Sequence, residues 1–277
     1  MLVLLIIPSI PVGILTVFFH LNTAGFIYTS LSTFMELIAF TASVYLARRF
    51  LDRRSFASLG LKVNRWLIPD LLAGIAIPFF MMGSIYLAME LLGWIDFRGF
   101  AWNFDPLPVV VGQMLLYLLI FTFVGWQEEL LSRGYHLQTL TSGINLFWGV
   151  VISSAVFGLL HLGNPNATWV SAAGIFFAGL FLAMGYLRTG QLWLSIGLHI
   201  GWNFFEGIVF GFPVSGLATF PLIRISVSGP PLWTGGAFGP EAGLIVLPAL
   251  ILGAALILLY TRLHSRTSNK VNPSASQ

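Results

Sequence analysis

The chain contains no cysteine among its 277 residues. This absence excludes disulfides, cysteine-ligated zinc sites and catalysis by a thiol nucleophile. The zinc-protease motif His-Glu-x-x-His is absent as well. A bound metal ion would therefore have to be held by scattered histidine, aspartate, glutamate or asparagine side chains.

Charged residues are also scarce, at 8% of the chain, whereas a soluble domain carries about 25%. Hydrophobic residues make up 57%, and the mean hydropathy is +0.89. This composition is typical of a polytopic membrane protein and leaves no room for a separate soluble domain. The net charge of +3 comes from few residues, which flank apolar runs, so it does not indicate binding to nucleic acid.

Apolar runs of about 20 residues, the length that crosses a membrane, predict an all-α polytopic bundle of about eight transmembrane helices. We expect no cleavable signal peptide, because the first basic residue is Arg48, and we interpret the N-terminal run as the first span. The expected spans are 3–20, 26–47, 67–92, 107–127, 145–162, 169–187, 192–212 and 243–261.

The basic residues predict the orientation of the chain. Six of the thirteen lie between residues 48 and 65, which the positive-inside rule places in the cytoplasm. With eight spans, both termini are then cytoplasmic. The expected divisions are two N-terminal helices (1–47), a basic cytoplasmic loop (48–66), a membrane core with the candidate site (67–212), a Gly/Pro-rich outer loop (213–241), and a last helix with a polar tail (242–277).

Polar groups inside the expected spans carry the functional signal, because an ionisable side chain is costly in lipid and usually faces a bundle interior or a wet cavity. The first group is Glu128-Glu129-Leu-Leu-Ser-Arg133. The spacing of four residues predicts an ion pair between Glu129 and Arg133 on one helix face. Glu128 points about 100° away, which makes it the freer carboxylate and the candidate general base. A solvated helix end is the alternative interpretation of this motif.

Two further motifs place histidines in apolar segments. In Phe157-Gly-Leu-Leu-His161, a ring lies one turn from an imidazole and can wall a site, although a lone histidine is often a core residue. In His199-Ile-Gly-Trp-Asn203, an imidazole and an amide share one face. This pair suits a metal ion or a developing oxyanion, and equally suits hydrogen bonding between helices. Glu206 lies one turn farther on and either supports the site or marks the membrane interface.

The side chains of the three motifs can lie close together only if their helices bring them to the same depth in the membrane. If the span 145–162 crosses the membrane fully, His161 lies near its outer end, whereas His199 lies roughly 10 Å deep at 1.5 Å per residue. We therefore expect the span 145–162 to start deep or to tilt, and the helix carrying Glu128 to continue past its motif. We also expect residues 163–166 to line a cavity within the membrane, where irregular backbone is tolerated.

In this order the three motifs resemble the CPBP family of intramembrane proteases, which includes the type II CAAX prenyl endopeptidases and bacterial abortive-infection-like proteins. The family pattern is Glu-Glu-x-x-x-Arg, Phe-x-x-x-His and His-x-x-x-Asn, which stand here at 128–133, 157–161 and 199–203. The resemblance covers roughly residues 50–210, including an upstream segment from Arg54 to Leu61.

The resemblance implies an all-α membrane fold, in a cell membrane or the endoplasmic reticulum, with a cavity open to the cytoplasm. It implies hydrolysis of peptide bonds and, in the prenyl-protein branch, removal of the last three residues of a lipidated CAAX terminus. The expected partners are the membrane and a peptide or protein substrate. The resemblance assigns paired roles: Glu128 and His161 activate water, Glu129 and Arg133 brace the site, and His199 and Asn203 bind a metal or stabilise an oxyanion.

Three of these residues could also bind a metal ion. Glu128, His161 and His199 supply three ligands that could hold Zn²⁺ and leave a position open for water, as catalytic zinc requires. A metal-free mechanism through glutamate and histidine is the alternative. No organic cofactor is expected.

Two other classes of protein would also bury these groups. A proton- or ion-coupled transporter buries glutamate and histidine, but we find no internal repeat, and the other spans offer little beyond Glu36 and Glu90. A non-catalytic scaffold or immunity protein of the same fold is the third interpretation. The ordered set of three motifs favours the peptidase.

Overall fold

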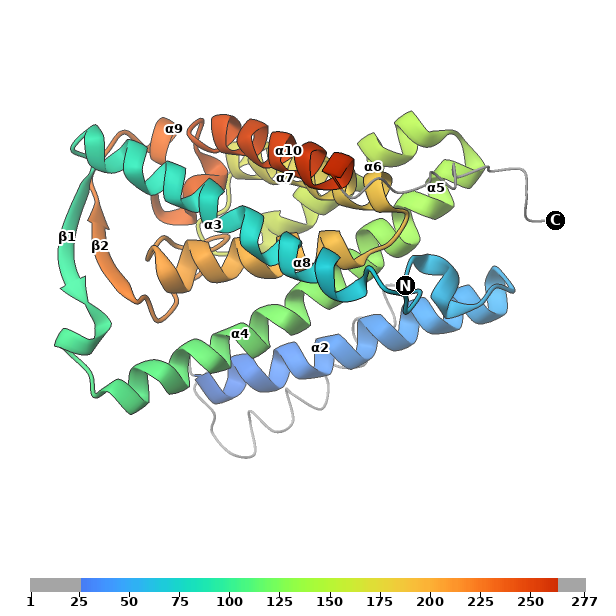
Figure 1. The fold of residues 1–277 in the computed structure, drawn as a ribbon, viewed down its shortest axis with the longest axis horizontal. Helices are drawn as coiled ribbons and strands as arrows, with labels where there is room; N and C mark the ends of the chain where they lie inside the picture. Colours follow the sequence, from blue (N-terminus) through green and yellow to red (C-terminus); the bar gives the residue numbers. More distant parts are fainter. Residues whose placement is uncertain (1–25, 264–277) are drawn as a thin grey trace.

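The computed structural model describes residues 26–263, so the expected first span and the polar tail lie outside the described residues. Within this range the chain forms a bundle of long helices with one small sheet at one end (Figure 1). The prediction of an all-α helical bundle is confirmed.

Some helices are joined by short turns, three stretches of the chain continue as π-helical segments, and longer connections contain the strands and 3-10 turns. Their bounds are α2 (Phe26–Leu46), α3 (Leu67–Leu91), α4 (Leu107–Glu129), α5 (Leu137–Gly143), α6 (Leu146–Leu160), α7 (Trp169–Thr189), α8 (Trp193–Asn203), α9 (Pro231–Thr234) and α10 (Val246–Leu263). The π-helical segments are η1 (Ala47–Leu51), η4 (Leu130–His136) and η6 (Phe204–Val209). The 3-10 turns are η2 (Phe56–Leu59), η3 (Ala101–Asn103), η5 (His161–Gly163), η7 (Gly236–Phe238) and η8 (Pro240–Ala242).

The helical stretches that could cross a membrane were identified by length and composition. Together with the apolar composition, they define a multi-pass integral membrane protein. In the described part of the chain there are six: Ser30–Leu51, Leu67–Leu91, Leu107–Gly143, Leu146–Gly163, Trp169–Thr189 and Val246–Leu263.

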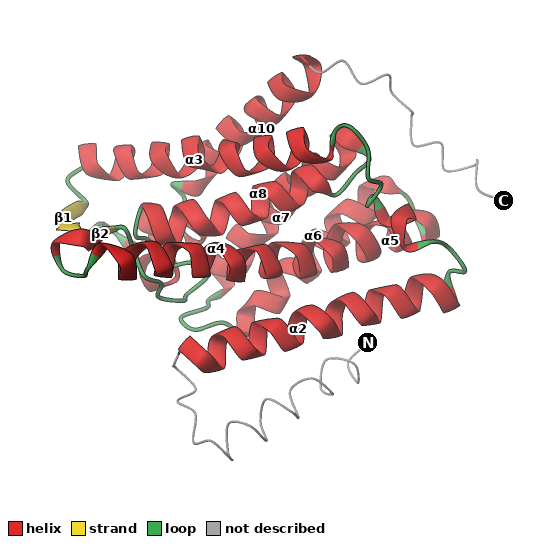
Figure 2. Cartoon of the chain, turned by 60° about the horizontal axis from the view of Figure 1, so that its bottom comes forward, coloured by secondary structure: helices red, strands yellow, loops and turns green. Residues whose placement is uncertain are grey.

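Helix α8 is shorter than these spans and lies at the centre of the bundle. Every residue from Leu194 to Asn203 is buried. Figure 2 shows α8 between α3 and α4, and it also packs on α7. Because α8 carries His199, the neighbours of this helix decide what the imidazole can reach.

Glycines set the distance between α8 and α3. A β carbon at Gly197 would lie 2.4 Å from the carbonyl oxygen of Leu71, and one at Gly201 would lie 2.5 Å from that of Ile75. Small residues let membrane helices approach closely and gain packing energy. These two glycines flank His199 and hold it at a fixed depth in the bundle.

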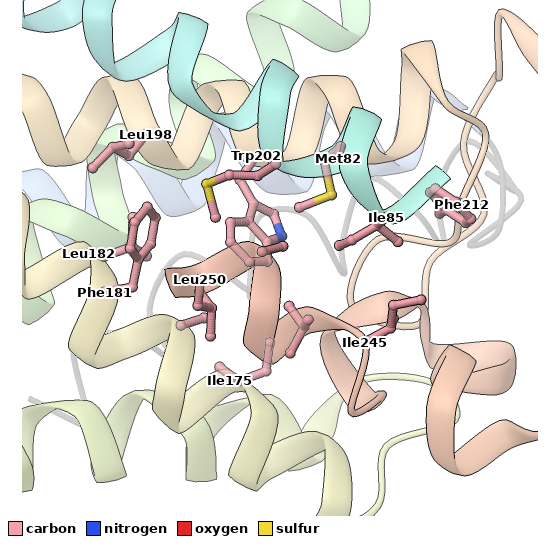
Figure 3. Close-up of a cluster of buried hydrophobic side chains, with 14 of the residues drawn as sticks. Met82, Ile85, Ile175, Phe181, Leu182, Leu198, Trp202, Phe212, Ile245 and Leu250 are labelled. Atoms are coloured by element: carbon pink, nitrogen blue, oxygen red, sulfur yellow. The ribbon is translucent and has the colours of Figure 1, made fainter. Parts of the chain in front are cut away.

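A hydrophobic core fills the space between α3, α7, α8 and α10. Figure 3 shows Met82, Phe181, Trp202 and Leu250, one from each of these helices, packed together. Each side chain in this group is less than a tenth exposed. The core therefore braces the side of α8 that faces away from α4.

The helix that begins with α4 continues past the Glu128 motif, as expected, and so runs beyond the expected membrane span that ends at residue 127. It continues through η4 and α5 to Gly143, and α6 then returns from Leu146, where the Asn145 side chain accepts a hydrogen bond from the Trp148 amide. Glu128 lies 15 residues before Gly143, and His161 lies 15 residues after Leu146. At 1.5 Å per residue, both positions are about 22 Å from the turn, so the two antiparallel segments bring them level.

The segment expected as an irregular outer loop, 213–241, contributes a strand. Strand β2 (Ile223–Val227) pairs antiparallel with β1 (Ile95–Phe100), with Ile95 opposite Val227. Figure 1 shows this sheet at the end of the bundle. The sequence pattern does not indicate this sheet, because each strand is short and pairs with a segment more than 100 residues away.

A substitution at Gly201 tests the close packing of α3 on α8. Gly201→Val places side-chain atoms against the α3 backbone, which cannot move aside cheaply, and is expected to destabilise the protein by about 1–3 kcal/mol or more. Thermal unfolding of purified protein in detergent measures the effect. Gly112→Ala is the matched control: its β carbon meets nothing within 4 Å, so its unfolding midpoint should stay at or above that of the wild type.

Candidate active site

Glu129 is the most deeply buried of the candidate residues. Its side chain is 0% exposed, and its Oε1 accepts hydrogen bonds from Arg133 Nη1 at 2.6 Å and His199 Nδ1 at 2.8 Å. The predicted ion pair between Glu129 and Arg133 is confirmed. Arg133 Nη2 also donates to the Gly179 carbonyl of α7 at 2.9 Å. One carboxylate therefore joins the helix from α4 to both α8 and, through Arg133, α7.

The Phe157 ring forms a wall that three polar side chains share. The Arg133 guanidinium carbon lies 4.4 Å from its centroid, which is the geometry of a cation–π contact. The His161 and His199 rings lie with their centroids 4.7 and 6.1 Å from it, both edge-on. This apolar wall limits how the two imidazoles can turn.

Both histidines present the same ring nitrogen to the site. His161 Nδ1 lies 2.8 Å from the Phe157 carbonyl oxygen, and His199 Nδ1 lies 2.8 Å from Glu129 Oε1. A carbonyl or a carboxylate can only accept, so each Nδ1 is the donor. In the neutral form of each ring, Nε2 then carries the lone pair.

Those two nitrogens converge on Glu128. Its Oε2 lies 3.8 Å from His161 Nε2 and 3.7 Å from His199 Nε2, which is too long for direct hydrogen bonds. This oxygen is buried and has no hydrogen-bond partner in the described part of the chain. Three acceptors thus face one space, and a water molecule donating hydrogen bonds, or a cation, would satisfy them.

The imidazole nitrogens and the carboxylate oxygen are suitable ligands for zinc, but the distances between them are longer than those around a tetrahedral zinc ion. Each imidazole has its Nδ1 held by a backbone or carboxylate oxygen, an arrangement common around metal-bound histidine. However, ligand atoms around tetrahedral zinc lie about 3.4 Å apart, given bonds of about 2.0–2.1 Å. Within residues 26–263, no group of three or more His, Asp or Glu side chains is arranged to hold a metal ion. The Glu128 oxygen and the two imidazole nitrogens are therefore farther apart than the ligands of a tetrahedral zinc ion.

Asn203 lies one turn beyond His199 on α8 and is 6% exposed. Among the described residues, it forms no hydrogen bond with the other five candidates. The structure therefore brings Glu128, Glu129, Arg133, His161 and His199 together, and Asn203 follows His199 by one turn on the same buried helix.

Two π-helical segments adjoin the site. Segment η4 begins directly after Glu129, and η6 begins directly after Asn203. Such wide turns are rare and frequent at functional sites. Here η4 contains Arg133, so the irregular turn is part of how the ion pair forms. Nothing in the sequence pattern predicts these turns.

One buried carboxyl group near the site escaped the sequence analysis. Glu241, in η8, is 4% exposed and accepts a hydrogen bond from Trp202 of α8. The sequence signal for this residue is a single acidic side chain within the Gly/Pro-rich segment of a membrane protein, where a charge is as costly to bury as inside a span.

The site is thus a buried set of glutamate, arginine and histidine side chains inside a membrane bundle. Residues 110–205 match the family model described as "Type II CAAX prenyl endopeptidase Rce1-like". This segment contains all six candidate residues, and the match confirms the resemblance that the motifs indicated.

A curated relative agrees with that match. Over 108 residues the chain is 29% identical to the protein of Bacillus subtilis (strain 168) named "Putative membrane peptidase YdiL". The alignment covers 39% of this chain and 42% of that protein, which is less than half of each. No solved structure matches the chain significantly.

The two adjacent glutamates should differ sharply in their effect on stability. Glu129→Gln leaves the buried Arg133 without a counter-charge, which is expected to cost about 3–5 kcal/mol. Glu128→Gln removes no hydrogen bond of the described residues and should change stability by less than about 0.5 kcal/mol. Thermal or denaturant unfolding in detergent compares them, and equal effects would contradict the assigned bracing role of Glu129.

Proposed function

We propose that this chain is a membrane-embedded endopeptidase in which Glu128 and His161 activate a water molecule. The observation that carries the proposal is the convergence of Glu128 Oε2 with the Nε2 atoms of His161 and His199 at 3.7–3.8 Å. A water molecule placed among these atoms can donate to two of them at ordinary hydrogen-bond lengths of about 2.8 Å. Such a water is oriented and lies beside a base.

The first step is attack on the substrate carbonyl. The water oxygen bonds to the carbonyl carbon as Glu128 takes one of its protons, and the carbonyl π electrons move onto oxygen. General base catalysis of this kind typically contributes about 10²–10⁴ in rate. His161 keeps the water aligned through Nε2, while its own orientation is held by the Phe157 carbonyl.

The oxyanion that forms needs donors. The Asn203 amide supplies one. His199 supplies another when it carries a second proton on Nε2, since the positive ring is then paired through Nδ1 with the Glu129 carboxylate. Donors fixed in a water-poor site stabilise such a charge strongly. Collapse of the tetrahedral species breaks the C–N bond, and Glu128 returns its proton to the leaving amine.

The proposed substrate is a membrane-associated peptide, with a prenylated CAAX terminus as the specific candidate. An apolar groove of about 610 Å³ lies between α2 and α4, and its lining residue Trp126 precedes Glu128 by two residues on the same helix. Such an apolar surface suits an isoprenoid chain that enters from the bilayer, because moving the chain from lipid into an apolar groove costs little free energy. The groove is lined by Leu37, Ile38, Thr41, Ala42, Tyr45, Phe56, Thr122, Phe123 and Trp126.

Cleavage assays with Glu128→Gln test the reaction. Protein reconstituted in liposomes is incubated with a farnesylated CAAX peptide, and release of the terminal tripeptide is measured by mass spectrometry. We expect wild type to cleave and Glu128→Gln to lose at least about 100-fold in kcat, because the base is gone. A variant as fast as wild type would disprove the role of Glu128. The same peptide without the lipid separates a CAAX-type substrate from a general one.

A separate measurement tests whether the protein binds zinc. We further propose that Zn²⁺, if it binds, is held by Glu128, His161 and His199, which would have to move closer together. Elemental analysis of pure protein, with His161→Ala as the matched variant, decides this. About one zinc per chain in wild type and none in the variant supports the metal; equal, trace amounts in both support the metal-free mechanism.

A further inference from the structure

Two buried glutamates beside the site have no part in the reaction proposed above. Glu206, in η6, is 0% exposed, and Glu241, in η8, is 4% exposed. The two carboxyl groups lie within electrostatic range of each other. Both fall outside the matched segment 110–205.

Three donors surround Glu241. Its Oε1 accepts from Trp202 Nε1 at 3.0 Å, and its Oε2 accepts from the Ser215 amide at 2.8 Å and the Ser215 hydroxyl at 2.7 Å. Hydrogen bonds of this kind are stronger when the acceptor is ionised. Trp202 belongs to α8, between His199 and Asn203, so Glu241 holds the helix that carries both.

The other side of this network reaches the segment after His161. Ser215 has a positive φ of 47°, which is unfavourable for a non-glycine residue and needs support from its surroundings. Its carbonyl oxygen accepts from Asn164 Nδ2 at 3.0 Å. Next to it, a β carbon at Gly216 would lie 1.9 Å from the Pro165 carbonyl oxygen, so the two loops are in close contact. Ser215 therefore links Glu241 to the chain three residues beyond His161.

Glu206 differs from Glu241 in its surroundings. Neither of its oxygens accepts a hydrogen bond of normal geometry among the described residues, although the Trp202 indole and the Glu241 carboxyl group lie near it. A second negative charge, buried without a donor and next to an existing carboxylate, is strongly unfavourable. The pair therefore holds one negative charge and one proton, with the charge on Glu241, where the donors are.

We propose that Glu241 is a positioning residue: through Trp202 and Ser215 its carboxylate fixes His161 relative to α8. Glu206 is its neutral neighbour. This clamp maintains the spacing at which Glu128 Oε2 lies between the two imidazoles. The kinetic part of the proposal rests on the endopeptidase function proposed above, whereas the structural part does not.

Two isosteric substitutions test the proposed difference between Glu241 and Glu206. Glu241→Gln replaces one acceptor oxygen by an NH₂ group, so a donor from Trp202 or Ser215 loses its partner. Glu206→Gln replaces a neutral carboxyl group by a neutral amide. In the peptide-cleavage assay, Glu241→Gln should lower kcat ten- to a hundredfold with KM within about twofold, as expected for misplaced catalytic groups. Glu206→Gln should leave both constants within about twofold of wild type.

Hydrogen–deuterium exchange provides a measurement that does not need activity. In Glu241→Gln, peptides covering 161–168 and 213–217 should exchange faster than in wild type, while peptides from α3 should not change. Glu206→Gln should match wild type throughout. Equal behaviour of the two variants, or unchanged exchange in Glu241→Gln, would overturn the proposal. If wild type cleaves no peptide, the proposed function fails, and the exchange data still decide whether Glu241 is the clamp.

Discussion

The hydrogen bonds to one fully buried carboxylate, Glu129, determine the arrangement of the other polar groups. A charge in an apolar interior is stable only when it is paired and hydrogen-bonded, and Glu129 meets this condition through Arg133 and His199. Arg133 in turn reaches the Gly179 carbonyl and the face of Phe157. Helices α4, α7 and α8, together with the end of α6, are thereby fixed relative to one another by groups that would be costly to separate.

The neighbouring glutamate is in the opposite condition, and this contrast is the basis of the functional proposal. Glu129 accepts two strong hydrogen bonds through Oε1, whereas neither imidazole is within hydrogen-bond distance of Glu128 Oε2, which is buried and faces both Nε2 atoms. What distinguishes Glu128 from the other buried polar groups is this position between two imidazole nitrogens, because clustered acids and bases without direct partners are typical of functional sites. Adjacent residues on a helix point in different directions, so a single turn supplies both a structural anchor and a reactive group.

The site is held from two sides. On one side Glu129 anchors the His199 ring, and on the other Glu241 binds Trp202 of the same helix and, through Ser215, the loop after His161. Glycine packing between α3 and α8 completes the support, because it leaves α8 no room to shift. Rigid support of this kind suits a reaction whose rate depends on distances of a few tenths of an ångström.

The sequence by itself determined the membrane class, the succession of apolar helices and the pairing of Glu129 with Arg133. These follow from composition and from the 3.6-residue period, which fixes contacts within about four residues. The tertiary structure decided how His161 reaches Glu128, since the two lie level only because the helix carrying Glu128 runs unbroken to the turn at residues 144–145 and α6 returns over an equal length. It also decided which imidazole nitrogens face the site and that Glu241 lies behind it. Such contacts join segments many residues apart, and they depend on helix lengths and on close packing that local patterns do not encode.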